Sequence, residues 1–282
     1  MGTRSSIAIK TEDGIKKFYN LNTKSYDRIP GTENIISLAS LKESNTIWSN
    51  DDVHIIDLKD GNNLLDCSLD FEVDLVIHLA GESGILRSLN ESDLYFQHNV
   101  LATKRLFDHF KNTRILYASS STAKEPNRNP YALTKHTVER IAPQSSLGMR
   151  FTTIYSNNSE LRPNMLIPRI IRNDVPHVTN HKRDFIHVAD IVSAILTLIK
   201  NEDVKGVIDI GTGKSQSLKS ILKEFGMNPE VKMDTPNERP DNVADISVLQ
   251  GLGWKTTIEL IQFLKDKKEL DFSEKPKYNV YN

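Results

Sequence analysis

One apolar run constrains the fold of this chain more than any other feature. The segment DLVIHLAG, Asp74 to Gly81, is almost continuously apolar and ends in small residues, which is typical of a strand buried on both faces of a sheet. Further strands are predicted at 53–58, 114–121, 148–155 and 206–213. Helical patterns are predicted between them at 94–110, 131–141 and 189–200. This alternation predicts an α/β fold with a parallel sheet and helices on both of its faces.

The sequence also predicts how this fold is divided. Residues 1–156, completed by about 186–213, form the sheet domain, and the less regular stretches 157–185 and 214–270 form a smaller lobe. Residues 271–282 are polar and are predicted to be a flexible tail. At the other end of the chain, the first two strands are placed at Ser6–Lys10 and Asn34–Ala39.

Charge and composition exclude several classes of function. The net charge of −1 gives no basic footprint for nucleic acid. The single cysteine excludes an internal disulfide framework and fits a reducing compartment. No apolar run approaches the ~20 residues that a membrane-spanning helix needs, and the N-terminus has no apolar segment typical of a signal peptide. We therefore expect a cytoplasmic protein without membrane or nucleic-acid partners.

A tyrosine and a lysine lie one helical turn apart after a strand that ends in serines. Pro130 is suited to the first turn of a helix, so Tyr131 and Lys135 fall on one helix face. An ammonium beside a phenol favours the phenolate, as a general base near neutral pH requires. A strand-end serine could hydrogen-bond the same substrate oxygen. The Tyr-x-x-x-Lys spacing alone is a weak signal, since most such pairs are ordinary turns of helix.

The sequence patterns do not support a phosphate-binding loop, a hydrolase nucleophile or a metal site. The segment Gly211–Ser215 resembles a phosphate-binding loop, but the motif needs a glycine where Ile208 stands. Ser120 lacks the G-x-S-x-G context of a hydrolase nucleophile. No metal site is expected, because the eight histidines show no ligand spacing.

Ordered motifs from about Asp52 to Glu269 resemble those of the extended short-chain dehydrogenase family, the NAD-dependent epimerases and dehydratases of nucleotide sugars. After HLAGESGILRSL and the Y-x-x-x-N-V pattern of residues 95–100 come YASSS and YALTK, then RDFIHVADIVSAI, IGTG, ERPDNVADIS and LGW. Thr153, the RPNM segment 162–165, and Asn180 with KRDF resemble the UDP-glucuronate 4-epimerases in particular. The resemblance implies a Rossmann-like fold whose C-terminal lobe binds the substrate.

The resemblance also implies NAD as cofactor and a nucleotide sugar as substrate, epimerised at C4 through a transient 4-keto intermediate. The implied catalytic residues are Tyr131, Lys135, Ser120 and, as the next candidate, Ser121. The implied cofactor-binding residues are Asp57, Leu58, Leu79, Ala80, Gly81, Asn99, Tyr131 and Lys135. Thr153 would face the substrate, and Arg183 and Arg239 would clamp its diphosphate; as isolated residues, the arginines would be interpreted as solvated surface charges. The family often forms homodimers through two helices of each subunit, so a homodimer is expected.

Two departures from the family pattern support a second hypothesis. The family opens with a glycine-rich loop, whereas the turn Thr11–Gly14 has one glycine and two carboxylates that would repel a pyrophosphate. The stretch after the serines is shortened and carries Lys124-Glu125 where relatives have Tyr-Gly. The first nineteen residues instead resemble the start of certain small phage proteins, which would imply a host cytoplasm. The alternative is therefore an inactive epimerase-like protein that binds nucleotide sugars.

Overall fold

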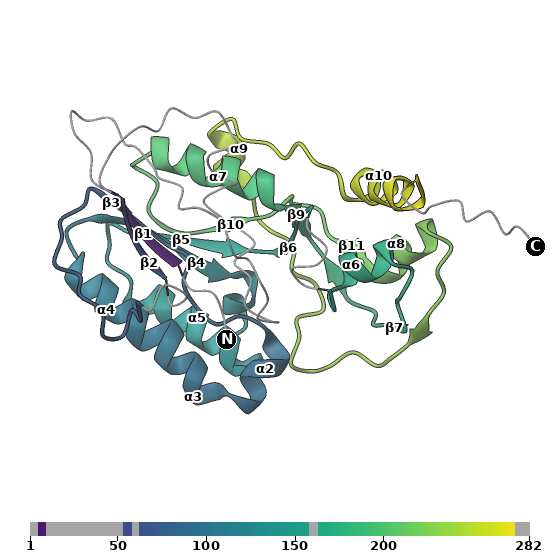
Figure 1. The fold of residues 1–282 in the computed structure, drawn as a ribbon, viewed down its shortest axis with the longest axis horizontal. Helices are drawn as coiled ribbons and strands as arrows, with labels where there is room; N and C mark the ends of the chain where they lie inside the picture. The colour runs from purple at the N-terminus through teal and green to yellow at the C-terminus, as the bar shows by residue number, and fades with distance from the viewer. Residues whose placement is uncertain (1–4, 10–52, 58–61, 158–162, 274–282) are drawn as a thin grey trace, which may run out of the picture.

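The computed structural model describes residues 5–9, 53–57, 62–157 and 163–273. The main sheet has the strand order β10-β5-β4-β3-β1-β2 (Figure 1). Its strands are β1 (Ser5–Ile9), β2 (Val53–Asp57), β3 (Leu75–His78), β4 (Arg114–Ser120), β5 (Leu147–Phe151) and β10 (Gly206–Ile210). The neighbours β3, β4, β5 and β10 pair in parallel, as predicted. The α/β class with a parallel sheet is confirmed.

The direction of the first strand differs from the prediction. β1 lies where a first strand was expected in the sequence, but it runs antiparallel to both β2 and β3. Alternation of apolar residues has the same period in either direction, so the pattern of Ser6–Lys10 could not reveal which way the strand runs. The predicted second strand at 34–39 and the turn at 11–14 lie outside the described residues.

Helices cover both faces of the sheet (Figure 1). One face carries α2 (Ile85–Asn90), α3 (Ser92–Tyr95), η2 (Phe96–Leu101), α4 (Ala102–His109) and α5 (Pro130–Ile141). The other face carries α7 (Val188–Lys200) and α9 (Ser247–Gly251). The predicted helix at 94–110 is thus observed as α3, η2 and α4 in succession, and η2 is a π-helical turn.

Alternate residues of β3 explain why one apolar run needs two layers of helices. Leu75 and Ile77 belong to the cluster that contains Ile191 and Ile195 of α7. Val76 belongs to a second cluster, with Leu106 and Phe107 of α4 and Val138 of α5. Because successive side chains of a strand point to opposite faces, a fully apolar strand is stable only between two covered faces.

The predicted strand at 148–155 is divided in two. Its first part is β5, and its second part, β6 (Thr153–Tyr155), leaves the main sheet to pair with β9 (Phe185–His187). The break occurs where Thr152 N donates to Ile210 O (3.1 Å) and Thr153 N donates to Asp184 O (2.9 Å). The prediction of one strand was wrong here, because these partners are distant in sequence.

The small lobe, defined as the described residues of 163–185 and 214–270, has its own apolar cluster. Its buried members include Ile170, Ile221 and Leu264. Its elements are α6 (Leu166–Ile171), β7 (His177–Val178), β8 (Lys182–Arg183), β11 (Gln216–Ser217), α8 (Leu218–Glu224), β12 (Glu230–Val231) and α10 (Leu260–Ser273). The domain boundaries themselves remain a prediction.

The tail predicted at 271–282 remains a prediction, although its first residues are helical. Residues 271–273 continue helix α10, and 274–282 lie outside the described residues. Leu260, Phe263 and Leu264 bury the first turns of this helix against the small lobe, which supports its continuation past the polar boundary seen in the sequence.

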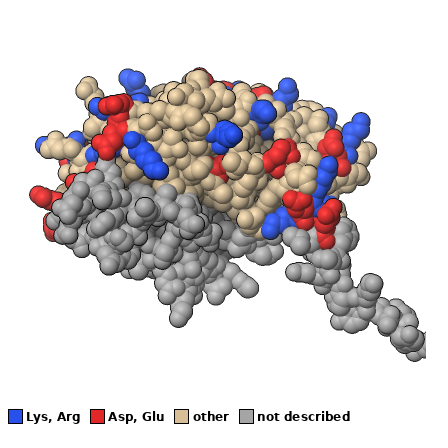
Figure 2. Space-filling model, turned by 90° about the horizontal axis from the view of Figure 1, so that it is seen from above, with Lys and Arg blue, Asp and Glu red and all other residues tan. Residues whose placement is uncertain are grey.

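The face shown in Figure 2 carries lysine and arginine interspersed with aspartate and glutamate, so this face has no basic stripe. In the part of the chain that the structure describes, no helix has both the length and the apolar character needed to cross a membrane.

Candidate functional site

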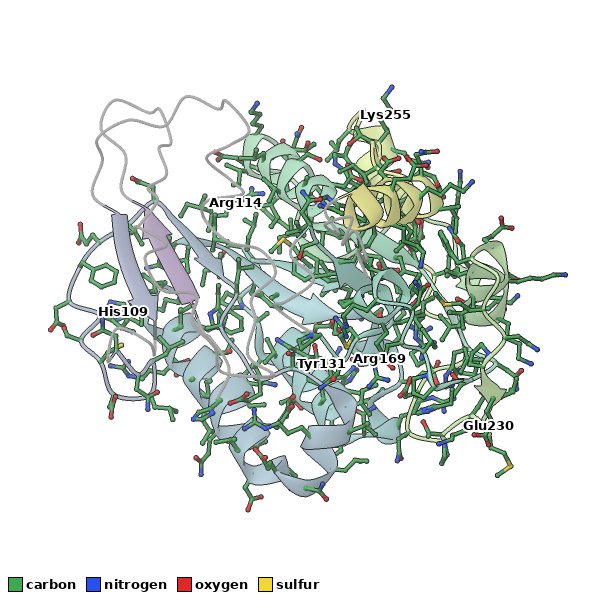
Figure 3. The ribbon with its side chains drawn as sticks, turned by 45° about the vertical axis from the view of Figure 1, so that its right-hand side comes forward. His109, Arg114, Tyr131, Arg169, Glu230 and Lys255 are labelled. Atoms are coloured by element: carbon green, nitrogen blue, oxygen red, sulfur yellow. The ribbon has the colours of Figure 1, made fainter. Side chains whose placement is uncertain are left out.

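The start of helix α5 fixes the position of the tyrosine and lysine. Asn129 caps the helix, its side-chain oxygen accepting from Ala132 N at 2.7 Å, and Pro130 occupies the first turn. Tyr131 and Lys135 therefore lie one turn apart on the same face of α5, as the sequence predicted. In Figure 3 Tyr131 lies in the middle of the molecule, between the main sheet and the small lobe.

Lys135 is buried against the end of β4. Its Nζ donates to the backbone oxygen of Ala118 at 2.9 Å, and the residue is 6% exposed. Burial lowers the pKa of Lys135 to about 8, while the nearby charge of Glu139 acts in the opposite direction. Burial lowers the pKa of His78 to about 3, and the nearby charge of Lys135 adds to this effect, so His78 is neutral near pH 7. The lysine is thus held in place by main chain in an environment that does not favour its charge.

A carboxylate follows Lys135 on the next turn of α5. Glu139 accepts two hydrogen bonds from Arg150, Nε at 2.8 Å and Nη2 at 2.6 Å, and a third from Ser119 Oγ. Its side chain is buried, as is Ser119. The network ties α5 to β4 and β5 and places a negative charge beside Lys135. Sequence reasoning missed this residue, although its spacing of four from Lys135 was a usable signal.

The chain that leaves β3 is held by an asparagine in the π-helical turn. Asn99 Oδ1 accepts from Glu82 N at 2.6 Å, and Asn99 Nδ2 donates to Glu82 O at 3.1 Å and to Thr134 Oγ1 at 3.0 Å. A Cβ on Gly81 would lie 2.8 Å from Asn99 Oδ1 and 3.3 Å from Lys135 Nζ. Only glycine fits there. Asn99, in the π-helical turn, therefore lies with its amide against the chain that leaves β3.

Tyr131 packs against a second tyrosine that the sequence analysis did not place in the site. The rings of Tyr95 and Tyr131 meet edge to face, with centroids 6.1 Å apart. Tyr95 is fully buried, and its hydroxyl lies 2.6 Å from Ser83 O and 3.0 Å from Gly84 O. The ring that supports Tyr131 is thereby fixed to the chain just beyond Gly81.

The strand-end serines lie beside the short loop that follows β4. This serine loop, residues 121–129, contains the 3-10 turns η3 (Ser121–Lys124) and η4 (Pro126–Arg128). Ser120 Oγ accepts from Thr122 N at 3.3 Å and from Thr122 Oγ1 at 2.9 Å. Ser121 contributes its backbone oxygen to Arg239, whose Nη1 donates to it at 2.9 Å.

The predicted substrate residues come from three segments that meet near this loop. Thr153 Oγ1 accepts from Asn242 Nδ2 at 3.0 Å. Arg183 Nη2 donates to Glu238 Oε2 at 2.6 Å, and its Nη1 to the backbone oxygen of Arg239 at 2.9 Å. Arg239 Nε donates to Glu125 Oε1 at 2.7 Å. Both predicted diphosphate-binding arginines are thus engaged with carboxylates of this chain.

The other predicted cofactor-binding residues lie after β3, at the end of β2 or outside the described residues. Leu79 and Ala80 are buried directly after β3, next to Gly81. Asp57 ends β2, and its backbone pairs with Ser5 of β1. Leu58 lies outside the described residues. Within the described part of the chain, no group of three or more His, Cys, Asp or Glu residues gathers as a metal site.

Comparison with known proteins identifies the family of this chain. The sequence model of the NAD dependent epimerase/dehydratase family matches residues 24–211. The chain is similar to an uncharacterized protein of Methanocaldococcus jannaschii, with 27% identity over 248 residues, covering 74% of this chain and 76% of that protein. It is also similar to a UDP-glucose 4-epimerase of Yersinia enterocolitica, with 25% identity over 253 residues, 69% of this chain and 74% of that enzyme.

This chain is also similar to a solved structure. MoeE5 in complex with UDP-glucuronic acid and NAD aligns with a TM-score of 0.61 and 27% identity, covering 76% of this chain and 83% of that one. The family match extends over more than half of the chain and includes β2, β3, β4, α5 and β5 with the tyrosine and lysine between them. This chain belongs to the NAD dependent epimerase/dehydratase family.

Proposed function

We propose that the protein is an NAD-dependent nucleotide-sugar epimerase that inverts C4 of a UDP-sugar through a transient 4-keto intermediate. The observation that carries the proposal is the position of Lys135, one turn after Tyr131 on α5, with its Nζ 2.9 Å from Ala118 O near the end of β4. In open α/β sheets, ligands bind beyond the carboxyl ends of the strands. Lys135 lies near such an end, with its Nζ 3.3 Å from the position that a Cβ of Gly81 would take.

Each residue of the pair has a separate task in this proposal. The Tyr131 hydroxyl accepts the proton of the sugar 4-hydroxyl and returns a proton when that hydroxyl re-forms. The ammonium of Lys135 favours the phenolate form of Tyr131 through its charge. Ser120 hydrogen-bonds the same sugar oxygen, with Ser121 as the next candidate. Edge-to-face packing against Tyr95 keeps the Tyr131 ring in one orientation.

The described residues fit the nicotinamide end of NAD, which supplies a hydride acceptor and donor when it is bound. Because a Cβ at Gly81 would clash with Asn99 Oδ1 at 2.8 Å, glycine lets the exit of β3 lie close to both Asn99 and Lys135. We assign Gly81, Asn99, Tyr131 and Lys135 to this end. Asp57 and Leu58 would meet the adenine, and Leu79 and Ala80 would line the path of the cofactor.

The substrate is proposed to be a UDP-hexuronate or a UDP-hexose. The MoeE5 complex contains UDP-glucuronic acid, and the Yersinia enterocolitica relative is a UDP-glucose 4-epimerase. In this chain Thr153 would face the sugar, while Arg183 and Arg239 would bind the diphosphate with their planar donor groups.

One observation favours the alternative, an inactive protein that binds nucleotide sugars. Glu238 and Glu125 already bind the two arginines proposed for the diphosphate, which lowers the affinity of the site for a second anion. The turn at 11–14, with its two carboxylates, is the sequence feature in favour of the same alternative. The two hypotheses differ in whether Tyr131 performs chemistry.

The deciding experiment has two steps. Nucleotide released from the purified protein by acid is identified by mass, and the emptied protein is titrated with NAD by calorimetry. Wild type and Tyr131→Phe are then assayed for interconversion of UDP-glucose with UDP-galactose and of UDP-glucuronate with UDP-galacturonate. The variant keeps the ring that packs on Tyr95, so its unfolding midpoint should be unchanged while its rate falls by about 10²–10⁴-fold. Absence of NAD binding at millimolar concentration would instead favour the inactive protein.

We further propose a homodimer and a cytoplasmic location, in the host cytoplasm if the source is viral. Large apolar side chains are exposed along neighbouring helices of one face of the sheet, and contact with a second copy would bury them. They are Leu86, Leu89, Phe96, Leu101, Leu133 and Ile141. The elements α2, η2 and α5 carry them, so these helices would form the proposed interface.

A further inference from the structure

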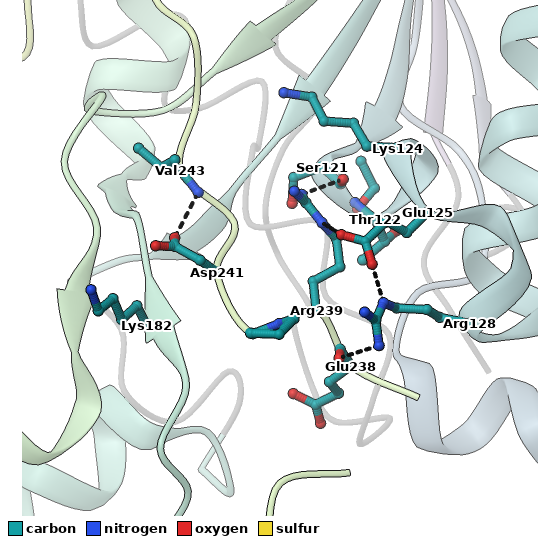
Figure 4. A network of polar contacts seen from close by, with 12 residues as sticks. Ser121, Thr122, Lys124, Glu125, Arg128, Lys182, Glu238, Arg239, Asp241 and Val243 are labelled. Atoms are coloured by element: carbon teal, nitrogen blue, oxygen red, sulfur yellow. Dashed lines mark hydrogen bonds and ion pairs between the residues drawn. The ribbon is translucent and has the colours of Figure 1, made fainter. Parts of the chain in front are cut away.

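Glu125 joins two distant parts of the chain through two guanidinium groups. Its Oε1 accepts from Arg239 Nε at 2.7 Å, across 114 positions of sequence, and its Oε2 accepts from Arg128 Nε within the serine loop (Figure 4). These hydrogen bonds hold the pKa of Glu125 below its ordinary value, with the bond from Arg128 as the larger cause. The carboxylate is therefore charged at neutral pH and shared between two cations.

Further hydrogen bonds fasten the serine loop to the segment 236–240. Arg128 Nη1 donates to Pro236 O at 2.8 Å and to Glu238 O at 3.1 Å. Asn129 Nδ2 donates to Asn237 O at 2.8 Å. Among the residues that the structure describes, Glu125 is the carboxylate that pairs with Arg239, so its charge is the anionic part of this contact.

The other side of the loop is held independently of Glu125. Lys124 forms an ion pair with the buried Asp209 at the end of β10, and Asp209 also accepts from Asp245 N at 2.9 Å. Lys124 should therefore stay in place when Glu125 moves. Any opening of the Glu125 contact is expected to change the loop locally.

A carboxylate and a diphosphate use the same N–H groups of an arginine. Arg239 has its Nε on Glu125 and its Nη1 on Ser121 O, so a phosphate oxygen can bind this edge only if Glu125 leaves it. The Glu125 side chain is 36% exposed, so water can hydrate the carboxylate once it is displaced. Leaving the contact is therefore feasible for Glu125, as it would not be for a fully buried acid.

We propose that Glu125 is an internal competitor for the diphosphate of the nucleotide sugar, which must displace this carboxylate from Arg239 and so releases the serine loop from segment 236–240. The inference rests on the proposed function, because it takes Arg239 as a ligand of the diphosphate. It assigns a role to the Lys124-Glu125 pair at which the sequence departs from its relatives. Glu125 would then set how tightly, and how reversibly, the substrate binds.

The test compares UDP binding by wild type and by two variants using calorimetry. Glu125→Gln keeps the shape and a neutral acceptor, and removal of the competing charge should tighten UDP binding about five- to tenfold. Glu125→Ala removes the acceptor as well and should bind UDP at least as tightly. Glu230→Gln is the matched control, since it removes one negative charge from an exposed position at the far edge of the small lobe (Figure 3). Its UDP affinity should equal that of wild type.

Hydrogen exchange, measured without and with UDP, gives a second readout. Amides of 121–129 and 236–240 should exchange faster in Glu125→Gln than in wild type, and UDP should increase their exchange in wild type relative to the rest of the small lobe. Equal UDP affinity in wild type and both Glu125 variants would overturn the inference and leave the proposed function standing. Failure of UDP to bind any of the proteins would overturn the diphosphate site itself. The two failures are thus distinguishable.

Discussion

Replacing Gly81 by alanine should damage the site through one identifiable contact. The new Cβ would lie 2.8 Å from Asn99 Oδ1, closer than such atoms approach, and the backbone φ of 154° is one that residues with side chains rarely adopt. The Asn99 amide must move, and its 2.6 Å hydrogen bond from Glu82 N must lengthen or break. We expect Gly81→Ala to lower the free energy of unfolding by about 2–4 kcal/mol.

This effect can be measured against a glycine that has space. Nothing lies within 4 Å of a Cβ on Gly251, the last residue of α9, so Gly251→Ala should be neutral or stabilise by up to about 1 kcal/mol. For a chain of this size, Gly81→Ala should lower Tm by about 5–12 °C. Urea unfolding at 25 °C gives the free energies directly, and NAD titration of the same proteins should show weaker binding for Gly81→Ala alone.

A double-mutant cycle separates the contact with Asn99 from backbone strain. In an Asn99→Ala background the clash with Oδ1 is gone, so Gly81→Ala should then destabilise the protein by about 1–2 kcal/mol less than in wild type. Equal effects in both backgrounds would mean that Asn99 does not limit the space at Gly81. Equal stability of the Gly81 and Gly251 variants would refute the steric reasoning altogether.

Three further changes test separate parts of the structure. Folding lowers the pKa of Lys135 from 10.5 to about 8, so between these pH values the unfolded chain binds more protons than the folded one. The free energy of unfolding of the wild type should therefore rise by roughly 3 kcal/mol as pH rises from 8 to 10.5. Urea titrations should show no such rise in Lys135→Met. Leu133→Asp should convert the proposed homodimer to a monomer by light scattering, with an unchanged circular dichroism spectrum. Asp184→Ala should destabilise by about 3–5 kcal/mol in urea, because the fully buried carboxylate accepts from Thr212, Gly213 and Ala244.

Local signals predicted the part of the site that lies on contiguous elements. Pro130 and the i, i+4 spacing predicted the position and orientation of Tyr131 and Lys135 on α5. The apolar run at 74–81 predicted a strand with buried faces, because each of its residues must pack against a neighbour wherever the chain goes. The family motifs then placed Asn99 beside them, and its hydrogen bonds to Glu82 and Thr134 agree with that position.

The remaining features depend on partners that are far away in sequence. The direction of β1 follows from its pairing with β2 and β3, and a strand pattern has no direction. The predicted strand at 148–155 is interrupted at Thr152, whose backbone N–H donates to Ile210 O. The pairing of Glu125 with Arg239 joins two residues that the sequence analysis noted separately, because nothing in the sequence indicates that they meet across 114 positions. Neither hydrophobic period nor propensity carries such information.

The environment of Lys135 bears on whether the site is active or a relic. Burial lowers the pKa of Lys135 although its ammonium donates to Ala118 O and the charge of Glu139 acts in the opposite direction, so at pH 7 the charge of the lysine opposes folding. A methionine of similar length would fill the same space between β4 and α5 without that charge, and Lys135→Met should therefore be more stable than wild type at pH 7. A residue that weakens the fold where an apolar one would strengthen it is typical of an active site, where function opposes stability. The same variant should lose epimerase activity; gain of stability without any activity to lose would instead identify the pair as a relic.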